Sequence, residues 1–439
     1  MTPLIYCIMT PSVENILLLG SILLFISIIA SKTSFRLGIP TLILFLLVGM
    51  LAGSDGPGGI YFNDPKIAQF LGVVALTFIL FSGGLDTKWE SVKPVVRQGL
   101  SLSTLGVLIT AILVGVFTSY VLDRSLLEGL LLGAIVSSTD SAAVFSILRS
   151  KNVGLKGNLR PTLEFESGSN DPMAYFLTIS MIYLVTNPEA SALSLIPKFL
   201  KGMVIGGICG FLMGRAMIWL VNKIKLDVAG LYPVLVLSLV FFTFSFTDFI
   251  GGNGFLAIYI SAIILGSNNF IHKKSLIRFY DGMAWLMQII MFLTLGLLVF
   301  PSKLVPILIP GILISVFLIL IARPIAVFIS LSFAKGLNIR KKLFLSWVGL
   351  RGAAPIVFAT YPMLAGIPYS DTLFNLVFFI SVSSVILQGT TLPIVAKWLH
   401  VSVPSSIKRK FPIDLEMNDD LKSELVELDI PTNSPVIGK

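Results

Sequence analysis

The sequence has few charged residues and almost no cysteine or histidine. Only 13% of its 439 residues are charged, whereas 55% are hydrophobic and the mean hydropathy is +0.93. So little charge cannot cover the surface of a water-soluble protein of this length, which excludes most soluble enzymes. The apolar residues are therefore expected to face lipid, and the chain is predicted to be an all-α integral membrane protein.

The scarce reactive residues exclude further classes of site. Cys7 and Cys209 stand 202 positions apart in apolar surroundings, so neither a disulfide nor a cysteine-based metal site is predicted. His272 and His400 border polar segments, as interfacial histidines do. Basic residues outnumber acidic ones by 32 to 23, but they are dispersed between apolar stretches, so no nucleic-acid partner is expected.

Thirteen apolar stretches can each cross the ~30 Å hydrocarbon core of a bilayer as a helix of about 20 residues. They run over residues 14–31, 37–54, 67–86, 98–121, 126–148, 162–186, 199–222, 228–248, 253–269, 280–300, 304–334, 343–363 and 373–397. With the N-terminus outside, 22 Lys and Arg residues fall in cytoplasmic segments and five on the opposite side. The positive-inside rule therefore predicts an outside N-terminus and a cytoplasmic C-terminus.

Three features of the first half recur in the second half. "GIPTLILFLLVGMLAGS" from Gly38 resembles "GNGFLAIYISAIILGSN" from Gly252, 214 positions later. Gly84 and Gly296 are 212 positions apart, and polar interruptions around Asp140 and Arg351 are 211 apart. Since seven spans separate each pair, the halves have opposite orientations, as in the inverted repeats of secondary transporters.

Four charged residues lie deep within predicted spans, where charge is costly and is by default functional. At 1.5 Å per residue, Asp171 lies about 16 Å and Asp140 about 14 Å from the nearest cytoplasmic basic residue. The same count places Arg323 about 18 Å and Arg351 about 14 Å deep. Two acids and two arginines are thus predicted to share the layer around the midplane.

The sequence "LEFESGSNDPMA" is typical of an oxygen-rich cation site. Ser167 and Asp171 are four residues apart on one helical face, as are Glu166 and Asn170. Hard oxygen ligands of this kind suit an alkali cation. Pro172 lacks an N–H, so it either leaves a carbonyl one turn earlier free to face an ion or only kinks the span.

The sequence "IVSSTDSAAV" places hydroxyl groups around Asp140 inside an apolar span. We expect the helix to unwind here, with Asp140 compensating the N-terminus of a half-helix; a helix-packing cluster of hydroxyl groups is the alternative. In the second half, "WVGLRGAAPIVFA" makes the equivalent span breakable, and Arg351 is expected to stabilise a half-helix C-terminus there. Arg323 is expected to neutralise Glu166 or the broken-helix dipoles, with a purely structural ion pair as its main role.

These motifs together resemble the monovalent cation:proton antiporter-1 family, and within it the bacterial NhaP-type K⁺/H⁺ (Na⁺/H⁺) antiporters. The resemblance covers about residues 10–400. It rests on six motifs: "SSTDSAAVF" at 137–145, "ESGSNDP" at 166–172, "GNGFLAIYISAIILGS" at 252–267, "FLTLGLLVFPS" at 292–302, "ARP" at 322–324 and "GLRGAAPIVFATYPM" at 349–363. The resemblance implies thirteen spans, a homodimer, a mobile core bundle that carries the ion, and two broken helices that cross at the site.

The resemblance also implies the roles of individual residues. Asp171 is the carboxylate shared by cation and proton, and Asn170 marks the electroneutral type of exchanger. Arg323 pairs with Glu166. The other cation ligands implied are Ser167, the backbone of Thr139, Glu166 and, through water, Asp140.

Residues 1–400 are predicted to form the exchanger domain and residues 401–439 a cytoplasmic tail. The segment "ELVELDIPTNSPVIGK" resembles the opening of a TrkA-C-like regulatory module, which implies a longer protein with a cytoplasmic regulatory ligand. The acidic tail after residue 411 is expected to be disordered.

The function predicted from these residues is electroneutral exchange of a monovalent cation for H⁺ in a bacterial inner membrane. Asp171 binds one or the other in competition, with K⁺ favoured over Na⁺, and neither a cofactor nor catalysis is expected. A Na⁺/H⁺ antiporter, and a regulated K⁺ channel or sensor on the same fold, are the alternatives. An intramembrane aspartyl protease is disfavoured because a Gly-x-Gly-Asp context is absent.

Overall fold

The structure is a computed structural model that describes residues 12–37, 40–334 and 336–404. Within these ranges the protein is helical, apart from an antiparallel pair of short strands, β1 (Val153–Leu155) and β2 (Ser402–Pro404). Most of the predicted cytoplasmic tail, from residue 405 onward, lies outside the described residues.

The helices follow the order of the predicted apolar stretches. The first half contains α2 (Val13–Leu37), α3 (Thr41–Ala52), α4 (Pro65–Asp86), α5 (Trp89–Val92), η1 (Lys93–Val95), α6 (Val96–Ser101), η2 (Leu102–Gly106), α7 (Val107–Leu122), α8 (Leu126–Ile135), α9 (Ser141–Ser150), α10 (Leu159–Thr186), η3 (Ala192–Ser194), α11 (Leu195–Lys223) and α12 (Leu231–Phe249). The second half contains α13 (Gly254–Ser267), α14 (Lys273–Leu298), η4 (Pro301–Leu304), α15 (Leu308–Phe317), η5 (Leu318–Ala322), α16 (Arg323–Ser330), α17 (Ile339–Trp347), α18 (Ala353–Phe358), α19 (Thr360–Leu364) and α20 (Ser370–Trp398).

The predicted number of thirteen spans is not confirmed by helix length and composition. Among the described residues, eight helical segments are long and apolar enough to cross a membrane: Val13–Lys32, Pro65–Asp86, Trp89–Leu122, Ala192–Lys223, Leu231–Phe249, Lys273–Leu298, Leu308–Ser330 and Ser370–Trp398. Of the remaining stretches, α3 and α13 are short, two are divided by breaks, and the 28-residue α10 carries the polar site residues. These departures arise because interrupted and polar helices are stabilised by protein rather than lipid.

The inverted repeat is visible in two equivalent helix crossings. Where α3 crosses α14, a Cβ added to Gly49 would lie only 3.0 Å from the Cα of Gly296. Where α4 crosses α13, a Cβ added to Gly84 would lie 2.6 Å from the Cβ of Ala262. The repeat relates position 49 to 262 and position 84 to 296, so the crossing of α3 with α14 is equivalent to the crossing of α13 with α4. Small residues are retained here because they let helix backbones approach closely.

A second mark of the repeat is a pair of π-helical turns, η2 and η5. They interrupt equivalent helices at 102–106 and 318–322. π-turns are rare, and these two lie 216 positions apart, close to the offset of 211–214 between the repeated motifs, so they support internal symmetry.

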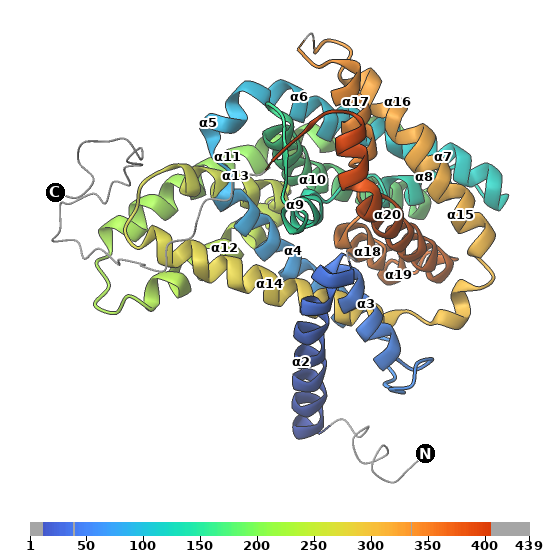
Figure 1. The fold of residues 1–439 in the computed structure, drawn as a ribbon, viewed down its shortest axis with the longest axis horizontal. Helices are drawn as coiled ribbons and strands as arrows, with labels where there is room; N and C mark the ends of the chain where they lie inside the picture. The colour runs from blue at the N-terminus through green and yellow to red at the C-terminus, as the bar shows by residue number, and fades with distance from the viewer. Residues whose placement is uncertain (1–11, 38–39, 335, 405–439) are drawn as a thin grey trace, which may run out of the picture. The chain divides into compact units, whose positions relative to one another are not determined.

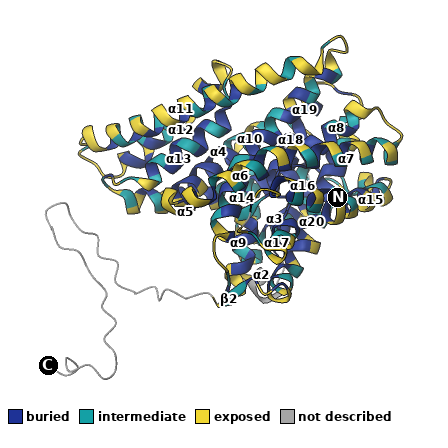
Figure 2. Ribbon diagram, turned by 90° about the horizontal axis from the view of Figure 1, so that it is seen from above, coloured by how far each residue is buried: buried dark blue, intermediate teal, exposed yellow. Residues whose placement is uncertain are grey.

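The helices place the two breaks near the middle of the bundle. In Figure 1, α9, α10 and α18 lie between α11–α14 on one side and α7, α8, α15 and α16 on the other. Figure 2 shows that the residues of α10 and α18 are mainly buried, whereas the outer faces of α11 and α12 are exposed. Many of these exposed side chains are large and apolar, such as Phe211 and Trp219, as expected for surfaces in contact with lipid.

Candidate functional site

The first break separates α8 from α9 and is closed by Asp140. α8 ends at Ile135 and α9 begins at Ser141, so five residues between them are not helical. Asp140 is the N-cap of α9, and its Oδ1 accepts a hydrogen bond from the backbone N–H of Ala143 at 3.0 Å. A carboxylate at this position satisfies an orphan donor and complements the positive end of the half-helix.

The second break separates α17 from α18 and carries Arg351. The two breaks cross, because the backbone N–H of Asp140 donates to the carbonyl of Leu350 at 2.8 Å. The Arg351 guanidinium is buried, and its Nη1 donates to the carbonyls of Ser137 and Ser138, each at 2.7 Å. These carbonyls follow the C-terminus of α8.

The location of Arg351 corrects the sequence-based expectation. We expected this charge to stabilise the half-helix end within its own span, but it covers the end of the other broken helix. Because the breaks cross, the carbonyls after α8 lie within reach of the side chain. The α17 end is instead covered by a neutral group of α20, since Gln388 Nε2 donates to the Trp347 carbonyl at 2.7 Å. Farther along the break, Ser384 Oγ accepts from the Arg351 N–H at 3.0 Å.

Three polar side chains of α10 contact the first break. The Ser167 hydroxyl donates to the carbonyl of Thr139 at 3.0 Å and accepts from the N–H of Ser141 at 3.0 Å. The Asn170 amide donates to the Thr139 hydroxyl at 2.6 Å and to its carbonyl at 3.2 Å. The Asp171 carboxylate accepts a hydrogen bond from the hydroxyl of Ser138. The break and α10 are therefore held together by side chains of the predicted site.

Glu166 faces away from this group and pairs with Arg323. Arg323 Nη2 and Glu166 Oε1 are 2.5 Å apart, and both side chains are buried. The pair joins α10 to α16. Glu166 Oε2 has no hydrogen-bond partner within the described part of the chain. The predicted partnership of these two residues is thus present, but the same contact directs Glu166 away from the other predicted ligands.

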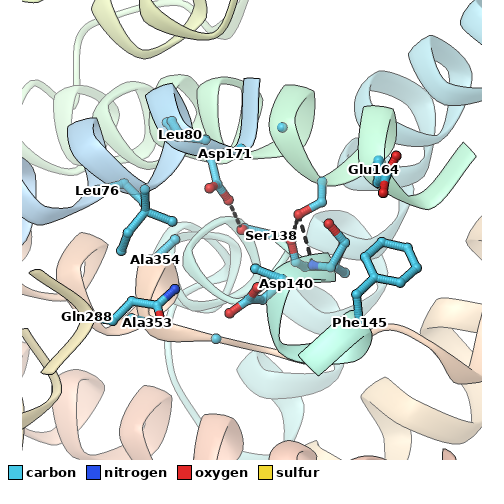
Figure 3. A pocket seen from close by; sticks show the side chains of 18 of the residues that line it. Leu76, Leu80, Ser138, Asp140, Phe145, Glu164, Asp171, Gln288, Ala353 and Ala354 are labelled. Atoms are coloured by element: carbon cyan, nitrogen blue, oxygen red, sulfur yellow. Dashed lines mark hydrogen bonds between the residues drawn. The ribbon is translucent and has the colours of Figure 1, made fainter. Parts of the chain in front are cut away.

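A cavity of about 190 Å³ opens onto Asp171. Of the predicted site residues, it is lined by Thr139, Asp140, Ser167 and Asp171, and not by Glu166, Asn170, Arg323 or Arg351. In Figure 3, Asp171 and Asp140 lie on either side of Ser138. Glu164 lies farther along the cavity and pairs with the exposed Arg160 at 2.8 Å, which marks the mouth. The space exceeds the volume of a few water molecules, so a partly hydrated cation fits.

Sequence reasoning missed two residues of this cavity as site candidates. Ser138, which donates to Asp171, belongs to the polar run around Asp140, and that run was the available signal. Tyr259 of α13 also lines the cavity, and its hydroxyl donates to the Glu164 carbonyl at 3.3 Å. It stands in an apolar stretch without a local pattern that marks it.

The polar groups of the site suit a hard cation. Its oxygen atoms are the Asp171 carboxylate, the hydroxyls of Ser138, Thr139 and Ser167, and the Thr139 carbonyl. Such oxygen donors suit alkali cations rather than soft transition metals. Within the described ranges, no group of three or more His, Cys, Asp or Glu side chains is placed to hold a metal ion.

Known proteins of similar sequence and fold can now be compared with this geometry. The family described as "Sodium/hydrogen exchanger, transmembrane" matches residues 21–398. The chain is 41% identical over 427 residues to the K(+)/H(+) antiporter NhaP of Alkalimonas amylolytica, covering 97% of this chain and 74% of the relative. It is 44% identical over 396 residues to the K(+)/H(+) antiporter NhaP2 of Shewanella baltica, covering 90% and 68%.

A solved structure has the same fold. The sodium proton antiporter MjNhaP1 of Methanocaldococcus jannaschii matches with a TM-score of 0.75 at 24% identity, over 88% of this chain and 99% of that one. The fold, the family match over most of the chain and the curated relatives agree with the resemblance found in the sequence. The chain belongs to the sodium/hydrogen exchanger family, a family of cation/proton antiporters, and is a multi-pass membrane protein.

Proposed function

We propose that this protein exchanges K⁺ for H⁺ electroneutrally and that Asp171 binds the two ions in competition. The observation that carries the proposal is the buried carboxylate of Asp171, which lines a cavity beside the unwound segment of a broken helix. Transporter sites form near such interrupted helices, where backbone and side-chain oxygens replace the water around an ion.

The arrangement of the two aspartates supports exchange at one of them. Asp140 is engaged as the cap of α9. Among the described residues, Asp171 accepts a side-chain hydrogen bond from Ser138 alone, so its carboxylate is available to a proton or a cation. The Oδ1 of Asn170 has no hydrogen-bond partner within the described residues and offers a further cation ligand. One carboxylate that exchanges one charge for one charge makes the cycle electroneutral.

Competition explains how the exchange is coupled. An ionised and empty Asp171 carries an uncompensated charge, which is costly to move through an apolar barrier. Either a proton or a cation neutralises it, so only the occupied site crosses. Each ion therefore leaves on the side where the other binds, and no cofactor is required.

The choice of K⁺ rests on the relatives, which are named K⁺/H⁺ antiporters at 41% and 44% identity. A sodium antiporter shares the fold at 24% identity, so Na⁺ remains the second candidate. Thr139, Ser167 and Glu166 stay in the proposed cation shell, with Glu166 reaching it only after separation from Arg323. Arg323 and Arg351 are proposed as supporting charges.

We also propose an outside N-terminus, a location in the bacterial inner membrane and a homodimer, as the resemblance implies. The mouth of the cavity bears Arg149 and Arg160, two of the basic residues that the positive-inside rule assigns to the cytoplasm. In this orientation Asp171 faces the cytoplasm. A cytoplasmic regulatory ligand that acts through residues 401–439 remains a prediction.

A proteoliposome assay with an internal pH dye tests the proposed exchange. External K⁺, Na⁺ or Li⁺ is added, with and without clamping the voltage. We expect K⁺ to drive internal alkalinisation that is independent of voltage, and Asp171→Asn to abolish it. Asp64→Asn is the matched control, because Asp64 caps α4 in a distant loop and asparagine caps equally well. Exchange that persists in Asp171→Asn would contradict the proposal.

A further inference from the structure

Two side chains of α13 donate hydrogen bonds to main-chain carbonyls of α10, one on each side of Asp171. The Asn253 amide donates to the carbonyl of Pro172 at 2.8 Å, and the Tyr259 hydroxyl donates to the carbonyl of Glu164 at 3.3 Å. Both donors are buried. The helix that carries the ion site is thus held at two points by a single neighbouring helix.

The donor helix α13 packs mainly against α11 and α4. The backbone N–H of Asn253 donates to the Gly202 carbonyl of α11 at 3.0 Å. A Cβ added to Gly206 would lie 2.8 Å from the Asn253 carbonyl oxygen, and a Cβ on Gly84 would meet Ala262. Such close backbone packing leaves α13 little freedom to move relative to α11 and α4.

The acceptor helix α10 packs mainly against α8 and α6, and it meets α13 across a smaller contact. At this contact a Cβ added to Gly168 would clash with the Tyr259 ring and lie 2.6 Å from its hydroxyl oxygen. The ring therefore rests directly on the α10 backbone. The two hydrogen bonds are thus polar contacts within the small interface between α10 and α13.

Cavities lie at both ends of α10. The cavity described above is lined by residues of its N-terminal half, from Arg160 to Asp171. A second cavity is lined by residues of its C-terminal half, from Tyr175 to Tyr183, together with α11 and Asp248 of α12. For Asp171 to face this opposite cavity, α10 must move relative to α13, since alternating access is largely a rigid-body motion of one bundle against the other.

We propose that Asn253 and Tyr259 form a two-point lock that holds α10 in the register in which Asp171 faces the first cavity. They act as positioning residues, because neither has to contact the ion. The inference rests on the proposed function only in treating the movement of α10 as the transport step. Both bonds must break when α10 moves, so each one favours the present state over the opposite one.

The size of the effect follows from the worth of one hydrogen bond. A net contribution of about 1 kcal/mol corresponds to a factor of about five in the population of the opposite-facing state. Removing one bond should therefore raise that population about fivefold. Because the bonds lie on opposite sides of Asp171, removing both should multiply the two effects unless one depends on the other.

The test measures accessibility rather than transport. In a background free of Cys7 and Cys209, single cysteines replace Ser180, which lines the opposite cavity, and Gln288, which lines the first. Each protein is labelled with a charged maleimide in nanodiscs, where both faces are open. With Tyr259→Phe or Asn253→Ser we expect labelling at position 180 to accelerate about fivefold. Labelling at position 288 should stay unchanged or slow.

Two controls separate the lock from general loosening. Tyr280→Phe removes a hydroxyl that donates to the Pro233 carbonyl at 3.0 Å. This is the same kind of hydrogen bond, but it joins α14 to α12 and does not involve α10. It should leave both labelling rates unchanged. Asn253 also caps α13 through its Oδ1, which accepts from Leu256 N–H at 3.0 Å. Serine can still cap α13, whereas alanine cannot. Comparing Asn253→Ala with Asn253→Ser therefore separates the effect of losing the cap from the effect of losing the hydrogen bond to Pro172.

The outcomes are distinct from those of the proposed function. A faster rate at position 180 alone, in both lock variants and not in Tyr280→Phe, supports the lock even if the transported ion is not K⁺. Equal acceleration at both positions would show loosening of the fold and would overturn the lock. Unchanged rates at both positions would overturn it as well.

Discussion

The break between α8 and α9 and the break between α17 and α18 are equivalent in the repeat, and they meet at one backbone hydrogen bond. The first presents Asp140, Thr139 and Ser138 to the cavity, and its new helix end is capped by its own carboxylate. The second contributes Arg351, whose guanidinium points away from its own half-helix to the carbonyls of the first. One break therefore supplies polar groups to the cavity, while the other supplies the charge that covers the exposed carbonyls of the first.

This difference shows how an inverted repeat can produce a polar site from two similar segments. The two breaks have the same local shape, since each divides an apolar span near its middle. The charged residues of the two breaks have opposite sign. The carbonyl end of α8 is covered by the Arg351 guanidinium, and the amide end of α9 is capped by the Asp140 carboxylate. Mutations in the second break should therefore damage the fold of the site, and mutations in the first should change ion binding.

Replacing Arg351 by methionine should have the largest effect. It removes both charged hydrogen bonds to the Ser137 and Ser138 carbonyls and leaves them buried without partners. We expect a loss of about 3 kcal/mol in unfolding free energy and loss of exchange, measured by thermal unfolding and by the pH-dye assay. Arg351→Lys should recover part of the stability and part of the exchange, because lysine keeps the positive charge but lacks the planar set of donors of the guanidinium. Normal exchange in Arg351→Met would contradict the claim that the second break stabilises the first through this side chain.

Two glycines of the second break should respond differently to alanine. A Cβ on Gly352 would clash with the Asp140 carboxylate and lie 2.6 Å from its Cβ, so the cap must shift. A Cβ on Gly349 would lie 3.1 Å from Nε of Arg323, whose long side chain can adjust. We expect Gly352→Ala to cost about 2 kcal/mol of stability and most of the exchange activity, and Gly349→Ala to cost less than half of that. Equal effects would contradict the assigned contacts.

Substitutions of Asp140 separate its cap from its charge. Asparagine caps a helix as well as aspartate, so Asp140→Asn should change stability by less than about 0.5 kcal/mol, whereas Asp140→Ala should cost about 1 kcal/mol. Both remove negative charge beside the cation, so both should weaken its apparent affinity about tenfold, equivalent to about 1.4 kcal/mol. Thermal unfolding and the half-saturating K⁺ concentration are the measurements. Unaltered K⁺ affinity would show that the first break does not act through charge.

The smallest effect on stability is expected from a pair of equivalent hydrogen bonds, one in each half of the repeat, that join segments at the ends of helices. Trp89 N–H donates to Ser267 Oγ at 3.1 Å, and the equivalent Ser302 N–H donates to Asp55 Oδ2 at 3.0 Å. The hydrogen bonds from Ser302 lower the pKa of Asp55 below its ordinary value of 3.8. Because the pKa of Asp55 is lowered in the folded state, the stability that its hydrogen bonds contribute is fully present above pH 3.8. It is lost as the pH falls through the lowered pKa.

Asp55→Asn should therefore cause only a slight fall in thermal stability at neutral pH. Its melting temperature should depend less on pH below about 4 than that of the unmodified protein, because the ionised acceptor is gone. Ser267→Ala removes the equivalent neutral tie and should leave the acid dependence unchanged. The same acid dependence in all three proteins would contradict the assignment.

Much of the fold could be predicted from apolar length and repeated motifs. Each predicted stretch corresponds to one helix or to consecutive helices, and the interruptions at Asp140 and Arg351 are where the motifs indicated. The number of thirteen spans stays a prediction, because helix length alone does not show whether two half-helices together cross the bilayer.

The site was predicted in composition more than in contacts. Helical spacing places Ser167, Asn170 and Asp171 on neighbouring faces, and all three contact the first break. Spacing cannot say which helix lies opposite a face, so Glu166 was grouped with ligands that the cavity does not include. The partner of Arg351 likewise depends on how the two breaks cross.

Proton release on cation binding tests the central claim most directly. Purified protein in weakly buffered detergent solution is titrated with KCl, and the pH change is measured with choline chloride as the salt control. If one carboxylate binds either ion, K⁺ should release up to one proton per chain, and the half-saturating K⁺ concentration should rise about tenfold for each pH unit in the acid range, where the site is protonated. Asp171→Asn should release none. Equal release from Asp171→Asn and the unmodified protein would contradict the account.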